Sequence, residues 1–130
     1  MDKLKQLLNI ILAYAKSERF RVSAAALRAL GYFLSQIDIP TVLSEATLPG
    51  QVRQVVHKSM HHKNPKVSWN ACVVIGKTIK NESLARSSVA SNIFFDERTV
   101  RTLFELVSDK PNIKARIQAI HALLCYKKVE

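Results

Sequence analysis

Three stretches of the chain share one spacing of apolar residues. They read RFRVSAAALRALG at residues 19–31, NPKVSWNACVVIG at 64–76 and NIKARIQAIHALL at 112–124. Each stretch contains three apolar residues spaced four positions apart. This spacing places the three residues on one face of a helix. We expect these inward rows to face the core: Val22, Ala26 and Leu30; Val67, Ala71 and Ile75; Ala115, Ala119 and Leu123.

Another apolar segment precedes each stretch at a similar distance. LLNIILAYAK begins at Leu7, VRQVVHKSMHH at Val52 and VRTLFELVSDK at Val100, so the pattern repeats after 45 and then 48 residues. Repeats of this length are typical of helical pairs that stack side by side. The pattern predicts an all-α chain, a right-handed α-solenoid of about three helical pairs, with units at about residues 1–47, 48–95 and 96–130. Asn64 with Pro65, and Asp96 with Glu97, have the residue types that favour helix starts.

A second row on the same helices is expected to pack between neighbouring units, with Trp69 as a wedge. In the third unit this row consists of Ile117, Ile120 and Leu124, which would face a fourth unit. The first helix is also apolar on more than one side, although a terminal repeat should be polar outside. We therefore expect the chain to be a segment of a longer solenoid, or to associate with itself or with another subunit.

The pattern Val-x-x-x-Ala-x-x-x-Ile/Leu-Gly resembles the second helix of HEAT repeats. KVSWNACVVIGKTIKN and NIKARIQAIHAL resemble consecutive units of the HEAT repeat-containing protein 6 family, and the resemblance covers nearly the whole chain. It implies an armadillo-like α-solenoid that acts as a scaffold and has no catalytic residues. HEAT units usually place Arg directly after the first Val of this pattern, where this chain has Ser23, Ser68 and Arg116, so looser stacking is expected. The Trp and Asn with which armadillo repeats hold basic peptides are replaced by Val73 and Lys77, which argues against such a ligand.

Composition agrees with one helical domain. The 130 residues are 48% hydrophobic and include only 3 Gly and 4 Pro. No apolar run approaches the roughly 20 residues needed to cross a bilayer, and the apolar residues of the first helix are needed for the core, so no membrane partner is expected. The two cysteines lie at unlike positions of the repeat, which favours a reducing intracellular setting, cytoplasmic or nuclear.

The net charge of +10 raises the question of an anionic partner. The polar face of the second helices carries no acidic residue in the three units, and Arg21, Lys66 and Lys114 should stack into one basic rung. We predict a concave partner-binding face, although charges at this spacing also suit a merely solvated helix face. The candidate residues are Arg21, Arg28, Tyr32, Lys66, Asn70, Lys77, Lys80, Lys114, Gln118 and His121.

The sequence gives only weak signals for a catalytic or metal-binding site. His57 and His61 lie four residues apart on one predicted helix face, but no third ligand is near and lysines surround them, so a solvated basic face is expected. Cys72 and Cys125 lack an oriented base with a third group behind it. The sequence therefore predicts no enzyme, no metal, no cofactor and no small-molecule substrate. The apolar residues 93–95 are expected to fold back as a short extra helix.

These observations favour a HEAT-type scaffold that binds protein, through the second-helix face or through its apolar ends. The partner would be an acidic segment or an adjoining subunit. Nucleic acid is the alternative, because residues 48–95 carry seven Lys and Arg against one Glu. Tyr32 is the only aromatic residue predicted on the basic face, which leaves little platform for stacked bases.

Overall fold

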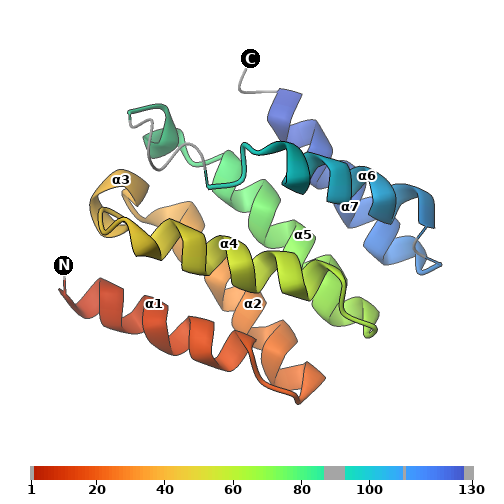
Figure 1. Ribbon diagram of the computed structural model, residues 1–130, viewed down its shortest axis with the longest axis horizontal. Coiled ribbons are helices and arrows are strands. Elements are labelled where there is room, and N and C mark those ends of the chain that lie inside the picture. The colour runs from red at the N-terminus through yellow and green to blue at the C-terminus, as the bar shows by residue number, and fades with distance from the viewer. Residues whose placement is uncertain (1, 87–92, 110, 128–130) are drawn as a thin grey trace.

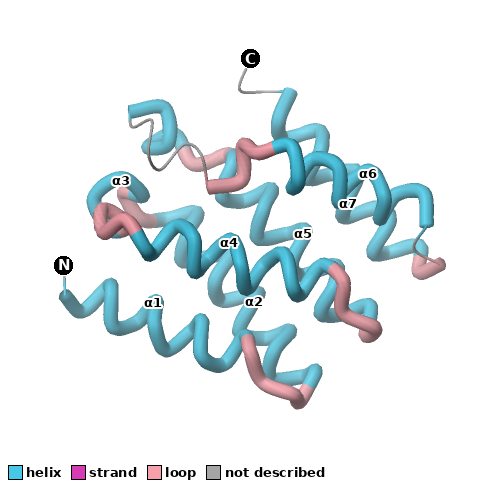
Figure 2. Tube along the Cα trace, in the orientation of Figure 1, coloured by secondary structure: helices cyan, strands magenta, loops and turns pink. Residues whose placement is uncertain are grey.

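The computed structural model describes residues 2–86, 93–109 and 111–127, and these ranges contain helices and no strand (Figures 1 and 2). The predicted all-helical class is therefore confirmed. Two short helices, α3 (Ile39–Val42) and the 3-10 helix η1 (Glu82–Arg86), lie between longer ones. The long helices are α1 (Asp2–Ala15), α2 (Phe20–Gln36), α4 (Thr47–Met60), α5 (Pro65–Ile79), α6 (Glu97–Asp109) and α7 (Ile113–Lys127).

The six long helices form two layers. Helices α1, α4 and α6 lie in one layer, and α2, α5 and α7 lie behind them in Figure 1. Across the layers α1 packs on α2, α4 on α5 and α6 on α7. Within the second layer α5 contacts α2 on one side and α7 on the other. Helix α5 is therefore the central element of the molecule.

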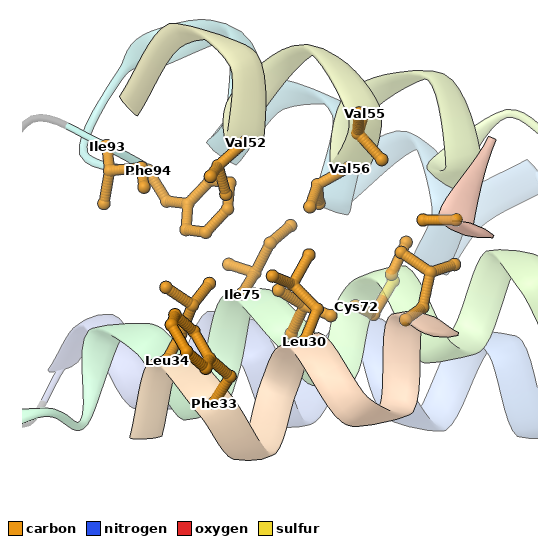
Figure 3. Packing of buried hydrophobic residues seen from close by; sticks show 14 of the residues in the cluster. Leu30, Phe33, Leu34, Val52, Val55, Val56, Cys72, Ile75, Ile93 and Phe94 are labelled. Atoms are coloured by element: carbon orange, nitrogen blue, oxygen red, sulfur yellow. The ribbon is translucent and has the colours of Figure 1, made fainter. Parts of the chain in front are cut away.

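The middle inward row is fully buried, as the spacing predicts. Val67, Ala71 and Ile75 each have 0% exposure. Figure 3 shows Ile75 among Leu30 of α2 and Val56 of α4, so side chains of both layers meet in one hydrophobic core. Val22 and Leu123, in the outer two pairs, are only half-buried.

The predicted helix starts of the second and third pairs are also present. The Asn64 side chain accepts a hydrogen bond from the backbone N–H of Lys66 at 2.9 Å, and Pro65 is the first residue of α5. Asp96 accepts from the backbone N–H of Thr99 at 3.2 Å, just before α6 begins. Each of these side chains satisfies a donor that the first helical turn leaves without a partner.

A side chain at the start of each second helix binds a carbonyl near the end of the preceding helix. The hydroxyl of Ser23 donates to the Ala15 carbonyl at 2.8 Å, and that of Ser68 donates to the Met60 carbonyl at 2.9 Å. At the equivalent position of the third pair, the Nε of Arg116 donates to the Val107 carbonyl at 2.8 Å. These residues occupy equivalent positions of the three helical pairs, directly after Val22, Val67 and Ala115. All three tie a helical pair together at its turn, so here serine makes the same bond as arginine.

The apolar segment 93–95 packs against the core but does not form the short helix that we expected. Ile93 and Phe94 have 0% exposure and belong to an irregular stretch before α6. The Arg53 Nε donates to the Ile93 carbonyl at 2.8 Å, and the Tyr126 hydroxyl donates to the Phe94 carbonyl. Backbone groups that a helix would have satisfied are thus bound by side chains from α4 and α7. Burial raises the pKa of Tyr126 well above its usual range, which keeps the donating proton in place.

The connections between the pairs bind each other. The Asn81 side-chain amide donates to the carbonyls of Leu34 and Ile37 at 2.7 and 2.8 Å. The backbone N–H of Ile39 donates to the Ser83 hydroxyl at 3.0 Å, and α3 packs on η1. The residues described in these connections are therefore part of the packed structure rather than free loops along an edge.

The expectation that His57 lies on a solvated face is wrong. His57 is 6% exposed, and its Nε2 lies 2.5 Å from the Thr99 hydroxyl, which in turn donates to Asp96 at 2.5 Å. Burial lowers the pKa of His57, and the positive charges of Arg98, Arg53 and His61 act in the same direction against the opposing effect of Asp96. His61, four residues later on the same helix, is exposed.

Replacing Ser68 tests the tie at the turn. The Ser68→Ala variant leaves the Met60 carbonyl without this donor in a buried place, so the free energy of unfolding should fall by about 1–2 kcal/mol. Urea denaturation followed by circular dichroism measures the change. Ser44→Ala, at an exposed serine, is the control and should change it by less than about 0.5 kcal/mol. Equal effects of the two variants would show that the tie contributes nothing.

His57 should make stability depend on pH. Its folded-state pKa lies below the ordinary value of 6.5, so on acidification the unfolded chain takes up the proton first. The stabilising contribution of neutral His57 is complete above about pH 6.5 to 7. It declines as the pH falls below this range towards the lowered pKa of His57 in the folded state. Melting temperatures between pH 7.5 and 5 should therefore fall less for His57→Gln than for the unmodified chain. The control His121→Gln, at an exposed histidine of α7, should keep the original pH dependence.

Candidate anion-binding groove

An open groove of about 620 Å³ runs over the second layer of helices. It exists because α2, α5 and α7 lie side by side and present the same helical row on the face away from α1, α4 and α6. Three helices contribute to it. The lining residues are Arg21, Ala24, Ala25, Arg28 and Tyr32 of α2, Lys66, Trp69, Asn70, Val73 and Lys77 of α5, and Lys114 and Gln118 of α7.

Eight of the ten residues predicted for the partner-binding face line this groove. The other two, Lys80 and His121, line a smaller cavity of about 170 Å³ between α5 and α7. The two hollows share Val73, Lys77 and Gln118, so they adjoin. The structure thus brings the ten residues onto one continuous surface, and their role in binding a partner stays a prediction.

The groove lining is positively charged and contains no acidic residue. Its five cationic side chains are Arg21, Arg28, Lys66, Lys77 and Lys114, contributed by three helices. Cations grouped in a hollow produce a positive potential that raises the local concentration of anions. Small apolar side chains, including Ala25 and Val73, lie between them. The groove is therefore suited to an anionic ligand with an uncharged backbone or short apolar groups.

Two lysines of the groove lie over aromatic rings of the neighbouring helix. The Lys77 Nζ of α5 is 4.4 Å from the centre of the Tyr32 ring of α2. The Lys114 Nζ of α7 is 4.5 Å from the centre of the Trp69 ring of α5. Each pair is within the distance at which a ring attracts a cation. The contacts bridge adjacent helices and hold two ammonium groups at the groove.

Trp69 is a groove residue that sequence reasoning did not place on the basic face. It was expected to be a wedge between units, and it is half-buried and lines the groove. It does meet the third pair, through Lys114. Trp69 directly precedes Asn70 and follows Lys66 by three residues, so it lies at the border between the two helical rows. This position is the signal that could have placed Trp69 in the groove.

The two amide side chains of the predicted partner-binding face, Asn70 and Gln118, are not equivalent. The Asn70 side chain donates to the Lys66 carbonyl of its own helix at 2.7 Å. This bond uses an N–H that we expected to face the partner, whereas Gln118, on α7, remains a candidate donor in the groove. The cationic side chains are therefore the main recognition groups.

No metal site or membrane span is found in the part of the chain that the structure describes. No group of three or more His, Cys, Asp and Glu side chains there is arranged to hold a metal ion. No described helix is both long and apolar enough to cross a bilayer. Cys72 and Cys125 are buried, are not joined in a disulfide and line the smaller cavity.

No protein-family model matches the chain, and no solved structure matches it significantly. The resemblance to HEAT repeats therefore stays an interpretation of the sequence pattern.

The contact between Lys114 and Trp69 should be measurable as an energetic coupling. A double-mutant cycle with Lys114→Met and Trp69→Leu should give a coupling of about 0.5–1 kcal/mol in the free energy of unfolding, because each single change removes the same contact. Urea denaturation of the four proteins supplies the values. A cycle between Lys63 and Trp69, two residues with no such contact, is the control and should give no coupling. A Lys114–Trp69 coupling near zero would contradict the prediction.

Proposed function

We propose that the chain is a non-enzymatic, HEAT-type scaffold whose groove binds an acidic segment of a protein partner. The observation that carries the proposal is the groove itself, with five cationic side chains from three helices and no acidic one. Two layers of helical pairs, each pair tied at its turn, are compatible with a right-handed α-solenoid. In such a protein, adjacent repeats together provide an extended binding surface.

The dimensions of the groove favour a short extended segment. Adjacent packed helices lie about 8–10 Å apart, so a ligand that crosses α2, α5 and α7 spans about 20 Å. An extended chain advances about 3.3 Å per residue, and about six residues therefore cross the groove. A segment of about six residues rich in Asp or Glu would place carboxylates near cations of each helix.

Nucleic acid is the second candidate, and Trp69 is the observation that favours it. A ring beside five cations is the combination that single-stranded nucleic acid uses for stacking and phosphate contact. However, the rings of Trp69 and Tyr32 each have a lysine ammonium group over them, so stacking a base on that face requires the lysine to move. A peptide carboxylate needs no such displacement, which is why we rank the acidic segment first.

The test uses Trp69, the single tryptophan of the chain, as an intrinsic fluorescent probe. A hexaglutamate peptide with uncharged ends should shift the emission on binding. Lys66→Glu combined with Lys114→Glu should weaken binding at least about tenfold, which corresponds to about 1.4 kcal/mol. The matched control, Lys3→Glu combined with Lys63→Glu, changes the net charge equally at exposed positions outside the groove and should weaken binding much less.

Each arm of the titration has a distinct outcome. Equal weakening by the two double variants would show that net charge alone attracts the peptide, and the groove would lose its role. Tighter binding of single-stranded DNA than of the peptide, lost in the groove variant and falling steeply with salt, would favour the second candidate instead. Absence of binding by either ligand would overturn both.

A further inference from the structure

The basic rung of Arg21, Lys66 and Lys114 occupies the same place in three neighbouring helices. Each of these residues is the second of its helix, in α2, α5 and α7 respectively. The starts of the three helices lie along one edge of the molecule, at the lower right of Figure 1. All three residues line the groove. The rung is therefore a row of cations that crosses one end of the groove.

This rung is the row of equivalent groove residues that has a Lys or Arg on every helix. Further along the helices, the other rows at the groove have at most one each. A ligand that crosses the three helices thus meets a cation at each of them only along the rung. The other rows are Ala24, Trp69 and Ile117; Ala25, Asn70 and Gln118; Arg28, Val73 and His121; and Tyr32, Lys77 and Cys125.

The groove supplies no acidic side chain to neutralise the rung. The first turns of α2, α5 and α7 contain no acidic residue, although the helix dipole favours one there. Helix α6, in the other layer, does have Glu97 in its first turn. The rest of the groove lining is also without an acid. Anions of a ligand would therefore be attracted both by the three cations and by the positive ends of the three helices.

The packing of the helices sets the interval between the cations. A β-carbon on Gly31 would lie 3.7 Å from the α-carbon of Val74, and one on Gly76 would lie 3.6 Å from the α-carbon of Ala122. The joint of α2 with α5 and the joint of α5 with α7 are thus equally close. Helices packed in this way have axes about 8–10 Å apart, so equivalent residues repeat across the groove at about 9 Å.

This interval distinguishes between two conformations of a ligand chain. In a β-strand, side chains on one face repeat every second residue, which is about 6.6 Å. In a polyproline II helix, side chains on one face repeat every third residue, which is about 9.3 Å. Over three helices a strand falls short of the rung by about 5 Å, whereas a polyproline II helix stays in step with it.

Trp69 favours the same conformation. Its half-buried ring lines the groove, and the Lys114 Nζ lies 4.5 Å from the ring centre. A carboxylate bound to Lys114 therefore brings the neighbouring residues of the ligand to the indole. Pro-rich segments bind grooves lined by aromatic side chains, and they lose little conformational entropy because they are extended before binding.

We propose that the ligand of the groove is a proline-rich segment in the polyproline II conformation with an acidic residue at every third position. Seven residues of the pattern EPPEPPE span about 19 Å and place one carboxylate at each of α2, α5 and α7. The inference rests on the proposed function, because it specifies the acidic segment that the groove binds.

Two peptides of equal composition test the spacing. Each has blocked ends, three glutamates and four prolines, but the glutamates are three residues apart in EPPEPPE and contiguous in PPEEEPP. Fluorescence of Trp69, the single tryptophan, follows both titrations at low ionic strength. EPPEPPE should bind at least about threefold more tightly, which is the effect of one or two exposed ion pairs.

Lys66 locates the central carboxylate. Lys66→Met should weaken the binding of EPPEPPE about threefold, because it removes one ion pair. The same variant should change the affinity for EPPQPPE, whose central residue is glutamine, by less than about 1.5-fold. Lys77→Met, at a groove cation outside the rung, is the matched control and should weaken the binding of both peptides by the same factor.

The outcomes separate this inference from the proposed function. If hexaglutamate binds in the groove but EPPEPPE binds no better than PPEEEPP, the spacing is wrong and the proposed function stands. Equal weakening of EPPEPPE and EPPQPPE by Lys66→Met also overturns the spacing alone. If neither hexaglutamate nor any of these peptides binds, the proposed function fails as well.

Discussion

The close approach of α5 to its two neighbours is the constraint on which the rest of the structure depends. Gly31 admits the backbone of α5 at Val74, and Gly76 admits that of α7 at Ala122. A β-carbon at either glycine would already touch the backbone of the neighbouring helix, so side chains longer than that of alanine would push the second helices apart. The spacing brings cationic rows of three helices to one groove, and it lets Lys114 reach the Trp69 ring on the adjacent helix. Packing of the core and the electrostatics of the surface are thus set by the same contacts.

Helical periodicity was sufficient to predict the helices, the middle inward row and the grouping of the basic face. These features follow from residues three, four and seven positions apart in one helix, and from the alignment of similar helices. Val67 and Ile75 are buried, and Lys66 and Lys77 line one groove. In a regular helix the position of a residue in the sequence fixes the direction in which its side chain points. The same reasoning requires no knowledge of how distant parts of the chain meet.

Features that depend on contacts between helices were not predicted. His57 was expected in solvent, but the Thr99 hydroxyl of α6 meets its ring, and nothing within α4 signals this partner. Trp69 lies at the border of two rows, and the position of α7 decided which surface it joined. Ser23 and Ser68 were interpreted as losses of an arginine, yet a hydroxyl at that position reaches the carbonyl of the preceding helix.

The buried stretch before α6 has a consequence for how the molecule comes apart. Stacked helical pairs can fray from their ends, since an end pair touches only one neighbour. Here Arg53 of the middle pair and Tyr126 of the last pair bind successive carbonyls, at Ile93 and Phe94. Detaching α6 and α7 together with this stretch therefore breaks the bond of Arg53 to Ile93 and exposes the Phe94 ring to water. The last two pairs should open as one cooperative unit, while α1, which lacks such a clamp in the described residues, is the end that frays first.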